Sequence, residues 1–104
     1  MRRPKIVQRI KDALNQINPG AKTILYGSEA RGDARRDSDI DLLILVDKDK
    51  IPVEEEKEII GRLSDFSLET GIIISSIILP KSNWENRPFK TPFYINVMNE
   101  GIIL

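Results

Sequence analysis

The segment Ile40–Val46 is an aliphatic run interrupted only by Asp41. A strand with one solvated face alternates apolar and polar residues, whereas a strand covered on both faces is apolar throughout. The run therefore predicts a central β-strand with other elements packed on both sides. With 104 residues the chain is long enough to bury one such core, and we expect a single domain over residues 1–104.

Helical and extended patterns alternate along the rest of the chain. Two segments have apolar residues at three- and four-residue spacing, which predicts amphipathic helices, and Gly71 is placed to cap the second. The segments expected to be helical are residues 4–18, a short helix near Ser28, residues 52–70, a single turn with a capping box over residues 82–85, and a helix from Thr91. Strands are expected at residues 22–26, 40–46, 71–79 and 102–104.

The predicted fold class is α+β, an α/β sandwich in which helices flank a small mixed sheet. The inward faces of the later helices can also be predicted from the apolar spacing. The side chains expected to face the core are Val53, Ile59, Ile60, Leu63 and Phe66 in the long helix, and Phe93, Tyr94, Val97 and Met98 in the last one.

The composition removes several classes of chemistry. Lysine plus arginine and aspartate plus glutamate both number 16, so the net charge is zero and does not favour a general nucleic-acid binder. Cysteine and histidine are absent, which excludes disulfides, thiolate metal sites and the usual general base. No apolar run approaches the ~20 residues that span a bilayer, and the N-terminus is no signal peptide. We therefore expect a soluble, cytoplasmic protein without a membrane partner.

A turn suited to phosphate lies between two of the expected strands. Gly27 follows the strand 22–26, and Ser28 begins the short helix. Glycine lets the backbone approach a ligand closely, and the free N–H groups of a helix start bind phosphate, to which the Ser28 hydroxyl adds a donor. Gly27 and Gly32 do not form a P-loop, because Asp33-Ala34 stands where Lys-Ser/Thr is required. A Gly-Ser pair on its own is most typical of an ordinary tight turn.

Two carboxylates, Asp39 and Asp41, stand at the entrance of the aliphatic run. Side chains alternate along a strand, so both are expected on one face, with Cα atoms roughly 6.5 Å apart. Such a pair can share one Mg²⁺ or hold two ions about 3.5–4 Å apart. Without a cation only solvation relieves their repulsion, and Asp-x-Asp alone most often marks a solvated turn.

The combination of Gly27-Ser28, Gly32 and Ser38-Asp39-Ile40-Asp41 before an aliphatic strand resembles the nucleotidyltransferases of the DNA polymerase β superfamily. The chain looks in particular like a minimal nucleotidyltransferase, of the type often paired with a HEPN partner protein, over essentially its whole length. The resemblance implies that Asp39 and Asp41 are the catalytic carboxylates and hold Mg²⁺. The residues it implies for binding a nucleoside triphosphate, expected to be ATP, are Gly27, Ser28, Arg31, Gly32 and Ser38.

The implied reaction is attack of a hydroxyl on the α-phosphate, with pyrophosphate leaving. The acceptor hydroxyl would belong to a partner protein or a small molecule. In this family the expected context is the antitoxin of a toxin–antitoxin pair, with the HEPN protein as acceptor. Positioning and charge neutralisation supply most of such catalysis, so the lack of histidine is no obstacle. Arg35 and Arg36 are interpreted either as solvated loop charges or as further triphosphate contacts.

One part of the family pattern is missing. Active members carry a third acidic residue on a neighbouring strand, but residues 71–79 contain no Asp or Glu, and Ser75 or Ser76 stands at that place. Glu69 and Asp65 are candidate substitutes, although both are expected on the helix surface. The first alternative function is therefore a catalytically degenerate module that binds the nucleotide or the partner without transfer. A transferase acting on an antibiotic or on RNA is a weaker alternative, since the chain is neutral and lacks a substrate domain.

Overall fold

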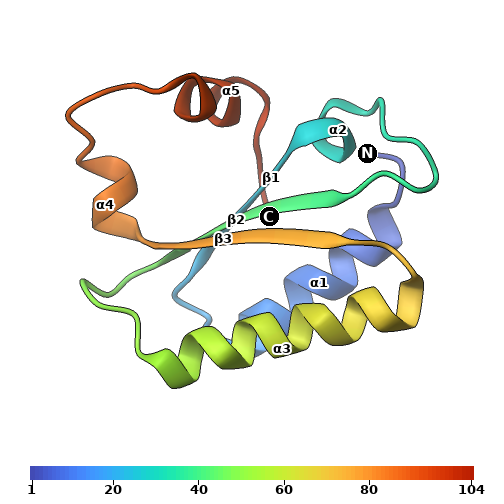
Figure 1. Cartoon of the computed structure of the whole chain (residues 1–104), viewed down its shortest axis with the longest axis horizontal. Helices are drawn as coiled ribbons and strands as arrows, with labels where there is room; N and C mark the ends of the chain where they lie inside the picture. The colour runs from blue at the N-terminus through green and yellow to red at the C-terminus, as the bar shows by residue number, and fades with distance from the viewer.

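The computed structural model describes all 104 residues as an α+β fold in which helices flank a mixed sheet, as predicted (Figure 1). The elements are α1 Pro4–Ile17, β1 Lys22–Tyr26, α2 Gly27–Arg31, β2 Ile40–Val46, α3 Val53–Thr70, β3 Ile74–Pro80, α4 Lys81–Glu85, α5 Pro92–Glu100 and β4 Ile102–Ile103. No helix combines the length and the apolar character that crossing a bilayer requires.

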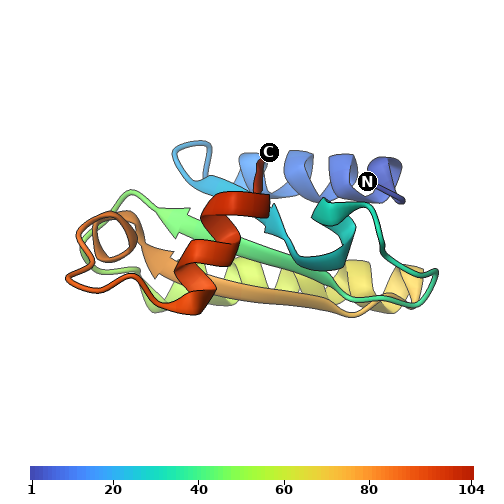
Figure 2. The same ribbon diagram turned by 90° about the horizontal axis from the view of Figure 1, so that it is seen from above.

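The sheet has the strand order β3-β2-β1-β4. Strand β1 is antiparallel to both β2 and β4, whereas β2 and β3 run parallel, connected by α3. Helices α1 and α3 cover one face of the sheet, and α4 and α5 lie over the other, where α5 crosses the strands (Figures 1 and 2).

Strand β2 is central, as the aliphatic run predicts. Leu42, Ile44 and Val46 point to one face and join the core formed with α1 and α3. Leu43 and Leu45 point to the other face and pack with side chains of α4 and α5. All five side chains are buried because both faces of this strand are covered.

The ends of several elements agree with the sequence prediction. Pro4 opens α1 in its first turn, and Gly71 ends α3 with a left-handed φ of 72°. The hydroxyl of Thr91 accepts the N–H of Tyr94 at 3.2 Å and caps α5. The capping box at Ser82 is wrong, because α4 begins one residue earlier and its N-cap is Pro80, which has no side-chain acceptor.

The expected strand 71–79 is shifted, since β3 covers Ile74–Pro80. Hydroxyls of α3 hold the intervening residues: Thr70 Oγ1 accepts the Ile72 N–H at 3.2 Å, and Ser67 Oγ accepts the Ile74 N–H at 3.2 Å. These bonds occupy backbone donors next to the start of the strand, so residues 71–73 form the connection from α3.

Three side chains predicted to face the core are exposed instead. Val53 is 62%, Ile60 48% and Met98 58% exposed. A helix that lies on one face of a sheet buries a single stripe, and in α3 that stripe consists of Ile59, Leu63 and Phe66.

Candidate functional site

The Gly-Ser turn and the Asp41 carboxylate meet at one end of the sheet. Tyr26 pairs with Asp41 across β1 and β2, so the next residue, Gly27, lies directly beside this carboxylate. A Cβ atom at Gly27 would stand 2.4 Å from Asp41 Oδ2, and the Gly27 φ of 74° is itself left-handed. Both facts restrict the position to glycine. The structure thus brings together the two halves of the sequence pattern.

The two predicted metal ligands occupy different surroundings. Asp41 is the second residue of β2 and is half-buried, whereas Asp39 precedes the strand and is exposed. Asp39 thus stands at the entrance of the strand, in agreement with the predicted strand bounds 40–46. Burial and the negative charge of Asp39 raise the pKa of Asp41, against the opposing effect of Arg31. A bound cation would relieve this repulsion, and carboxylate oxygens are donors that Mg²⁺ accepts.

Ser75 lies at the place where a third carboxylate is expected beside Asp41. The parallel register pairs Asp41 with Ser75 and Leu42 with Ser76. Since side chains alternate along a strand, Ser75 shares the face of Asp41, while Ser76 shares the face of Leu42, which α1 and α3 cover. The structure therefore selects Ser75 of the two serines left open by the sequence.

Neither candidate substitute joins the carboxylate pair. Glu69 lies on α3 and its Oε1 accepts from Arg9 Nη2 of α1 at 2.7 Å. Asp65 lines the same shallow surface hollow as Glu69. Both lie on the helix surface, as expected, and no group of three or more His, Cys, Asp or Glu side chains is placed to hold a metal ion.

The remaining predicted nucleotide-binding residues shape the loop around the pair. Gly32 ends α2 with a φ of 84°, and its N–H donates to the Ser28 carbonyl at 3.0 Å. The Ser38 hydroxyl accepts the Arg35 N–H at 2.8 Å, which closes the turn before β2. Gly32 and Ser38 thus have local structural roles. Arg31 is exposed at the end of α2.

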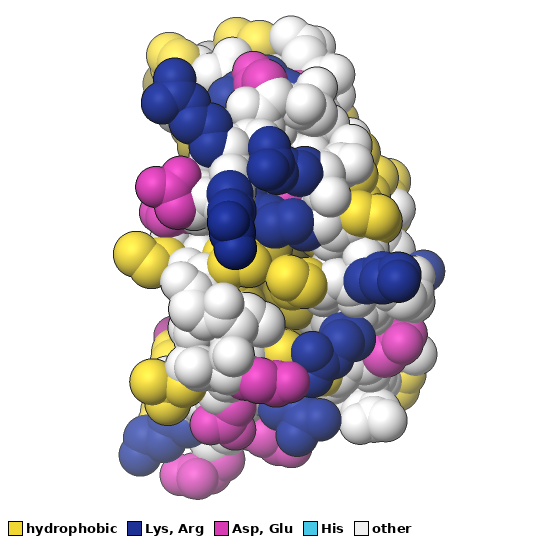
Figure 3. Space-filling view, turned by 90° about the vertical axis from the view of Figure 1, so that its right-hand side faces the viewer, with side chains coloured by type: hydrophobic (Ala, Val, Ile, Leu, Met, Phe, Trp, Pro, Cys, Tyr) yellow, Lys and Arg dark blue, Asp and Glu magenta, His cyan; other side chains and the backbone are white.

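Arginines gather around this end of the molecule. Figure 3 views the right-hand side of Figure 1, where α2 and the chain start lie, and shows Lys and Arg side chains spread across it among Asp and Glu side chains. The exposed arginines of these segments are Arg2, Arg31, Arg35 and Arg36. Asp33, Asp37 and Asp39 are exposed in the same segments, so the charge of this surface is mixed.

Sequence reasoning missed Glu100, which contacts the predicted site directly. Its Oε1 accepts the Gly27 N–H at 3.2 Å, and both carboxylate oxygens accept from Arg31 Nη1 at 3.2 Å. Gly27 is 73 positions away in the chain, and a pattern of local spacing carries no information about such a contact.

Glu29 is a second residue that sequence reasoning missed, and its buried side chain joins α2 to the N-terminal segment. Its side chain is fully buried and forms an ion pair with Arg3 Nε at 2.5 Å, where the Arg3 side chain is only 9% exposed. The backbone N–H groups of Arg2 and Arg3 also donate to Glu29 Oε2. Burial acts to raise the pKa of Glu29, but these hydrogen bonds and the charge of Arg3 outweigh it, so the pKa lies below its ordinary value.

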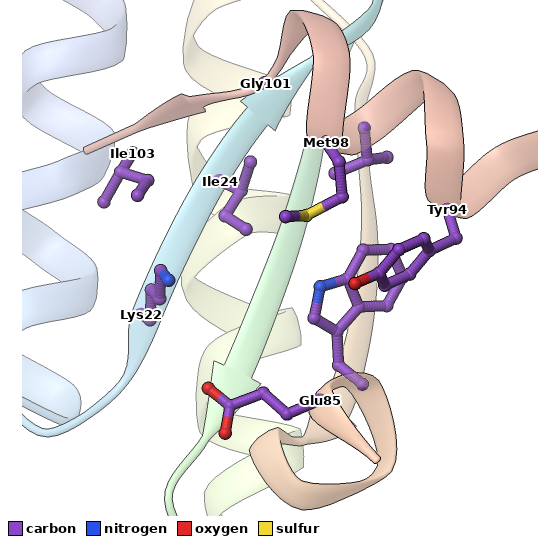
Figure 4. A pocket seen from close by; sticks show the side chains of 9 residues that line it. Lys22, Ile24, Glu85, Tyr94, Met98, Gly101 and Ile103 are labelled. Atoms are coloured by element: carbon purple, nitrogen blue, oxygen red, sulfur yellow. The ribbon is translucent and has the colours of Figure 1, made fainter. Parts of the chain in front are cut away.

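A separate cavity of about 250 Å³ lies between β1 and the helices α4 and α5 (Figure 4). Ile24, Tyr94 and Met98 line it, with Lys22 and Glu85 among its polar residues. None of the predicted metal-binding or nucleotide-binding residues contributes to it. The cavity is therefore distinct from the candidate site.

Replacing Gly27 with alanine is expected to abolish nucleotide binding, because the new methyl group would displace the Asp41 carboxylate. The matched control is Gly71→Ala: Gly71 has nearly the same φ, 72°, but nothing lies within 4 Å of an added Cβ. Both changes are expected to lower the free energy of unfolding by about 1–2 kcal/mol through backbone strain. Equal Mg·ATP affinities of the two variants, measured by titration calorimetry, would contradict this prediction.

Comparison with known proteins places these features in a wider context. The model of the nucleotidyltransferase domain family matches residues 7–104. The chain is 40% identical over 93 residues to "Putative protein adenylyltransferase MJ0141" of Methanocaldococcus jannaschii, covering 89% of this chain and 81% of that protein. It is 32% identical over 106 residues to "Putative protein adenylyltransferase MJ0604" of the same organism, covering 100% and 99%.

Two solved structures share the fold. A crystal structure described as "a putative nucleotidyltransferase from Sulfolobus solfataricus" superposes with a TM-score of 0.58 at 20% identity, covering 95% of this chain and 76% of that one. A second, described as "the toxin-antitoxin with AMP-PNP", gives a TM-score of 0.58 at 18% identity, covering 99% and 72%. At these identities the likeness concerns the fold.

Proposed function

Because the chain belongs to the nucleotidyltransferase domain family, we propose that it transfers a nucleotidyl group from Mg·ATP to a hydroxyl of a partner protein. The observation that carries this proposal is the closeness of the Gly27 turn to Asp41, since it joins a turn suited to phosphate to a carboxylate suited to a hard cation. The adenylyltransferase names of the two relatives support ATP as the donor.

In this proposal each residue of the site has a defined role. Asp39 and Asp41 hold Mg²⁺, which neutralises charge on the triphosphate when bound. The Gly27-Ser28 turn and Arg31 bind the β- and γ-phosphates, and the half-buried Ser28 hydroxyl supplies a further donor. The acceptor hydroxyl oxygen forms a bond to the α-phosphorus and loses its proton to solvent, while the bond from that phosphorus to the β-phosphate oxygen breaks and pyrophosphate leaves.

The proposed partner is a HEPN-family protein, with this chain as the antitoxin of the pair. The support is the family resemblance, together with the fold shared with a structure described as a toxin–antitoxin. That structure is named with AMP-PNP, an adenine nucleotide, which agrees with the proposed donor.

The test is incubation of the chain with Mg²⁺, the product of the neighbouring gene and ATP labelled on the α-phosphate. We expect label on the partner, no label when the γ-phosphate carries it instead, and none after addition of EDTA. The γ-label separates nucleotidyl transfer from phosphoryl transfer. Nucleotide binding without label on the partner would contradict the transfer reaction.

The position of Ser75 favours a second candidate, a module that binds Mg·ATP and its partner without transfer. A serine hydroxyl is a poor base at neutral pH, and β3 presents no carboxylate beside Asp41. If Ser75 is what limits the reaction, Ser75→Asp is expected to raise the labelling rate at least about 10-fold, a modest part of the ~10²–10⁴-fold that a general base supplies.

Ser76→Asp is the matched control for this prediction. Its carboxylate would enter the face covered by α1 and α3, so we expect no gain in labelling and a lower thermal midpoint. Equal labelling rates for Ser75→Asp and the unmodified chain would show that the third position does not limit transfer.

A further inference from the structure

Glu100 joins α5 to the turn that carries the candidate site. It is the last residue of α5, and its side chain is 23% exposed. One carboxylate oxygen accepts the N–H of Gly27, and both accept from Arg31 Nη1, all at 3.2 Å. Two groups assigned to the phosphates are thus held by one carboxylate from a distant part of the chain.

The place of this carboxylate is unfavourable for α5 itself. The C-terminus of a helix carries a partial negative charge, so an acidic side chain there is destabilising. The last turn of α5 contains no basic residue to offset it. Glu100 therefore does not stabilise its own helix. Its favourable contacts are with Gly27 and Arg31 of α2.

The two groups that Glu100 holds lie at the end of the sheet that carries Asp41. Gly27 lies directly beside the Asp41 carboxylate, so a shift of the Gly27 turn would change the surroundings of that carboxylate. Arg31 donates from Nε to Asp33 and from Nη1 to Glu100, both at 3.2 Å, which leaves Nη2 for a ligand. A guanidinium fixed by two carboxylates loses little further freedom when it binds phosphate.

We propose that Glu100 is a positioning residue, which sets the Gly27-Ser28 turn and the Arg31 guanidinium in the arrangement that receives the triphosphate. The inference rests on the proposed function only for the identity of the ligand. It assigns no chemical step to Glu100 and requires no contact between this carboxylate and the nucleotide.

Two variants separate the two contacts. Glu100→Ala removes both, whereas Glu100→Gln keeps an oxygen that can accept the Gly27 N–H and removes the charge opposite Arg31. In the nucleotide-free protein, amide hydrogen exchange at Gly27 is expected to be about 10-fold faster in Glu100→Ala and close to unchanged in Glu100→Gln. Because the helix end loses an unfavourable charge, the thermal midpoint of Glu100→Gln is expected to be unchanged or higher.

Mg·ATP affinity is then measured by titration calorimetry on the same proteins. We expect about 10-fold weaker binding in Glu100→Gln and at least as large a loss in Glu100→Ala. The matched control is Glu69→Gln, which removes a carboxylate from the ion pair between Glu69 and Arg9 on the helical face. We expect the Mg·ATP affinity of this variant to be unchanged.

The outcomes distinguish this inference from the proposed function. Absence of Mg·ATP binding by the unmodified chain overturns the proposed function, while exchange at Gly27 still decides whether Glu100 holds the turn. Unchanged exchange in Glu100→Ala overturns the positioning role. Tighter binding in Glu100→Gln would also overturn it, since Glu100 would then compete with the phosphates for their donors.

Discussion

Asp41→Asn is expected to weaken Mg·ATP binding, and any nucleotidyl transfer, by about 100-fold or more. The amide supplies a neutral oxygen where the proposal requires an anionic ligand. Removing even a residue that only orients a metal ligand lowers metal affinity by about 10–100-fold. The thermal stability of the nucleotide-free protein, in contrast, is not expected to fall. Burial and Asp39 already disfavour the charged form of Asp41, so the neutral side chain leaves the thermal midpoint unchanged or raises it.

The matched control for this prediction is Asp47→Asn. Asp47 is exposed and directly follows the other end of β2, so its replacement removes the same charge away from the Gly27 turn. Calorimetric titration with Mg·ATP and a thermal melt of each protein provide both readouts. If Asp41→Asn binds Mg·ATP as tightly as Asp47→Asn, the assignment of the site to Asp41 is wrong.

The second large effect concerns the buried ion pair under α2. Glu29→Ala is expected to lower the free energy of unfolding by about 3–5 kcal/mol, because it leaves the Arg3 guanidinium buried without its partner. One nitrogen of that guanidinium, Nη2, is already buried without a hydrogen bond. Urea unfolding measures the loss. The double variant Arg3→Met with Glu29→Leu is expected to recover only part of it, since apolar residues can replace the buried charges but leave the N–H groups of Arg2 and Arg3 without their acceptor.

The same pair predicts a dependence of stability on pH. The pKa of Glu29 in the folded protein lies below its ordinary value of 4.5, so the ionised form stabilises the fold at pH values above 4.5. This contribution is lost as the pH falls from 4.5 through the folded-state pKa. We expect the unfolding free energy of the unmodified chain to decrease more between pH 6 and pH 3 than that of the double variant. Parallel pH profiles would contradict this role of Glu29.

The features of the fold that can be predicted from sequence are those set by local composition. Burial on both faces makes β2 aliphatic throughout, and the left-handed turn after α3 requires a residue such as Gly71. The start of β3 could not be predicted, because the hydroxyls of Ser67 and Thr70 hold the residues before it. Such bonds depend on how α3 meets the sheet.

The candidate site divides in the same way. The closeness of the Gly27 turn and Asp41 can be predicted from the sequence, because a short connection joins the neighbouring strands β1 and β2. Whether Ser75 or Ser76 faces Asp41 depends on the register of β3, and a shift by one residue reverses every side chain. Glu29 and Glu100 look like surface charges in the sequence, and only the tertiary structure shows one buried against Arg3 and the other bound to α2.

The pairing of β4 with β1 has a consequence for protein synthesis. Ile24 and Leu25 pair with Ile103 and Ile102, and the Leu104 N–H donates to the Thr23 carbonyl. At about 5–20 residues per second, the ribosome adds these partners several seconds after β1. A nascent chain that already contains Gly27 and Asp41 therefore still exposes the outer edge of β1 and lacks Glu100. Completion of the sheet and of the site therefore waits for the same codons, those of residues 100–104.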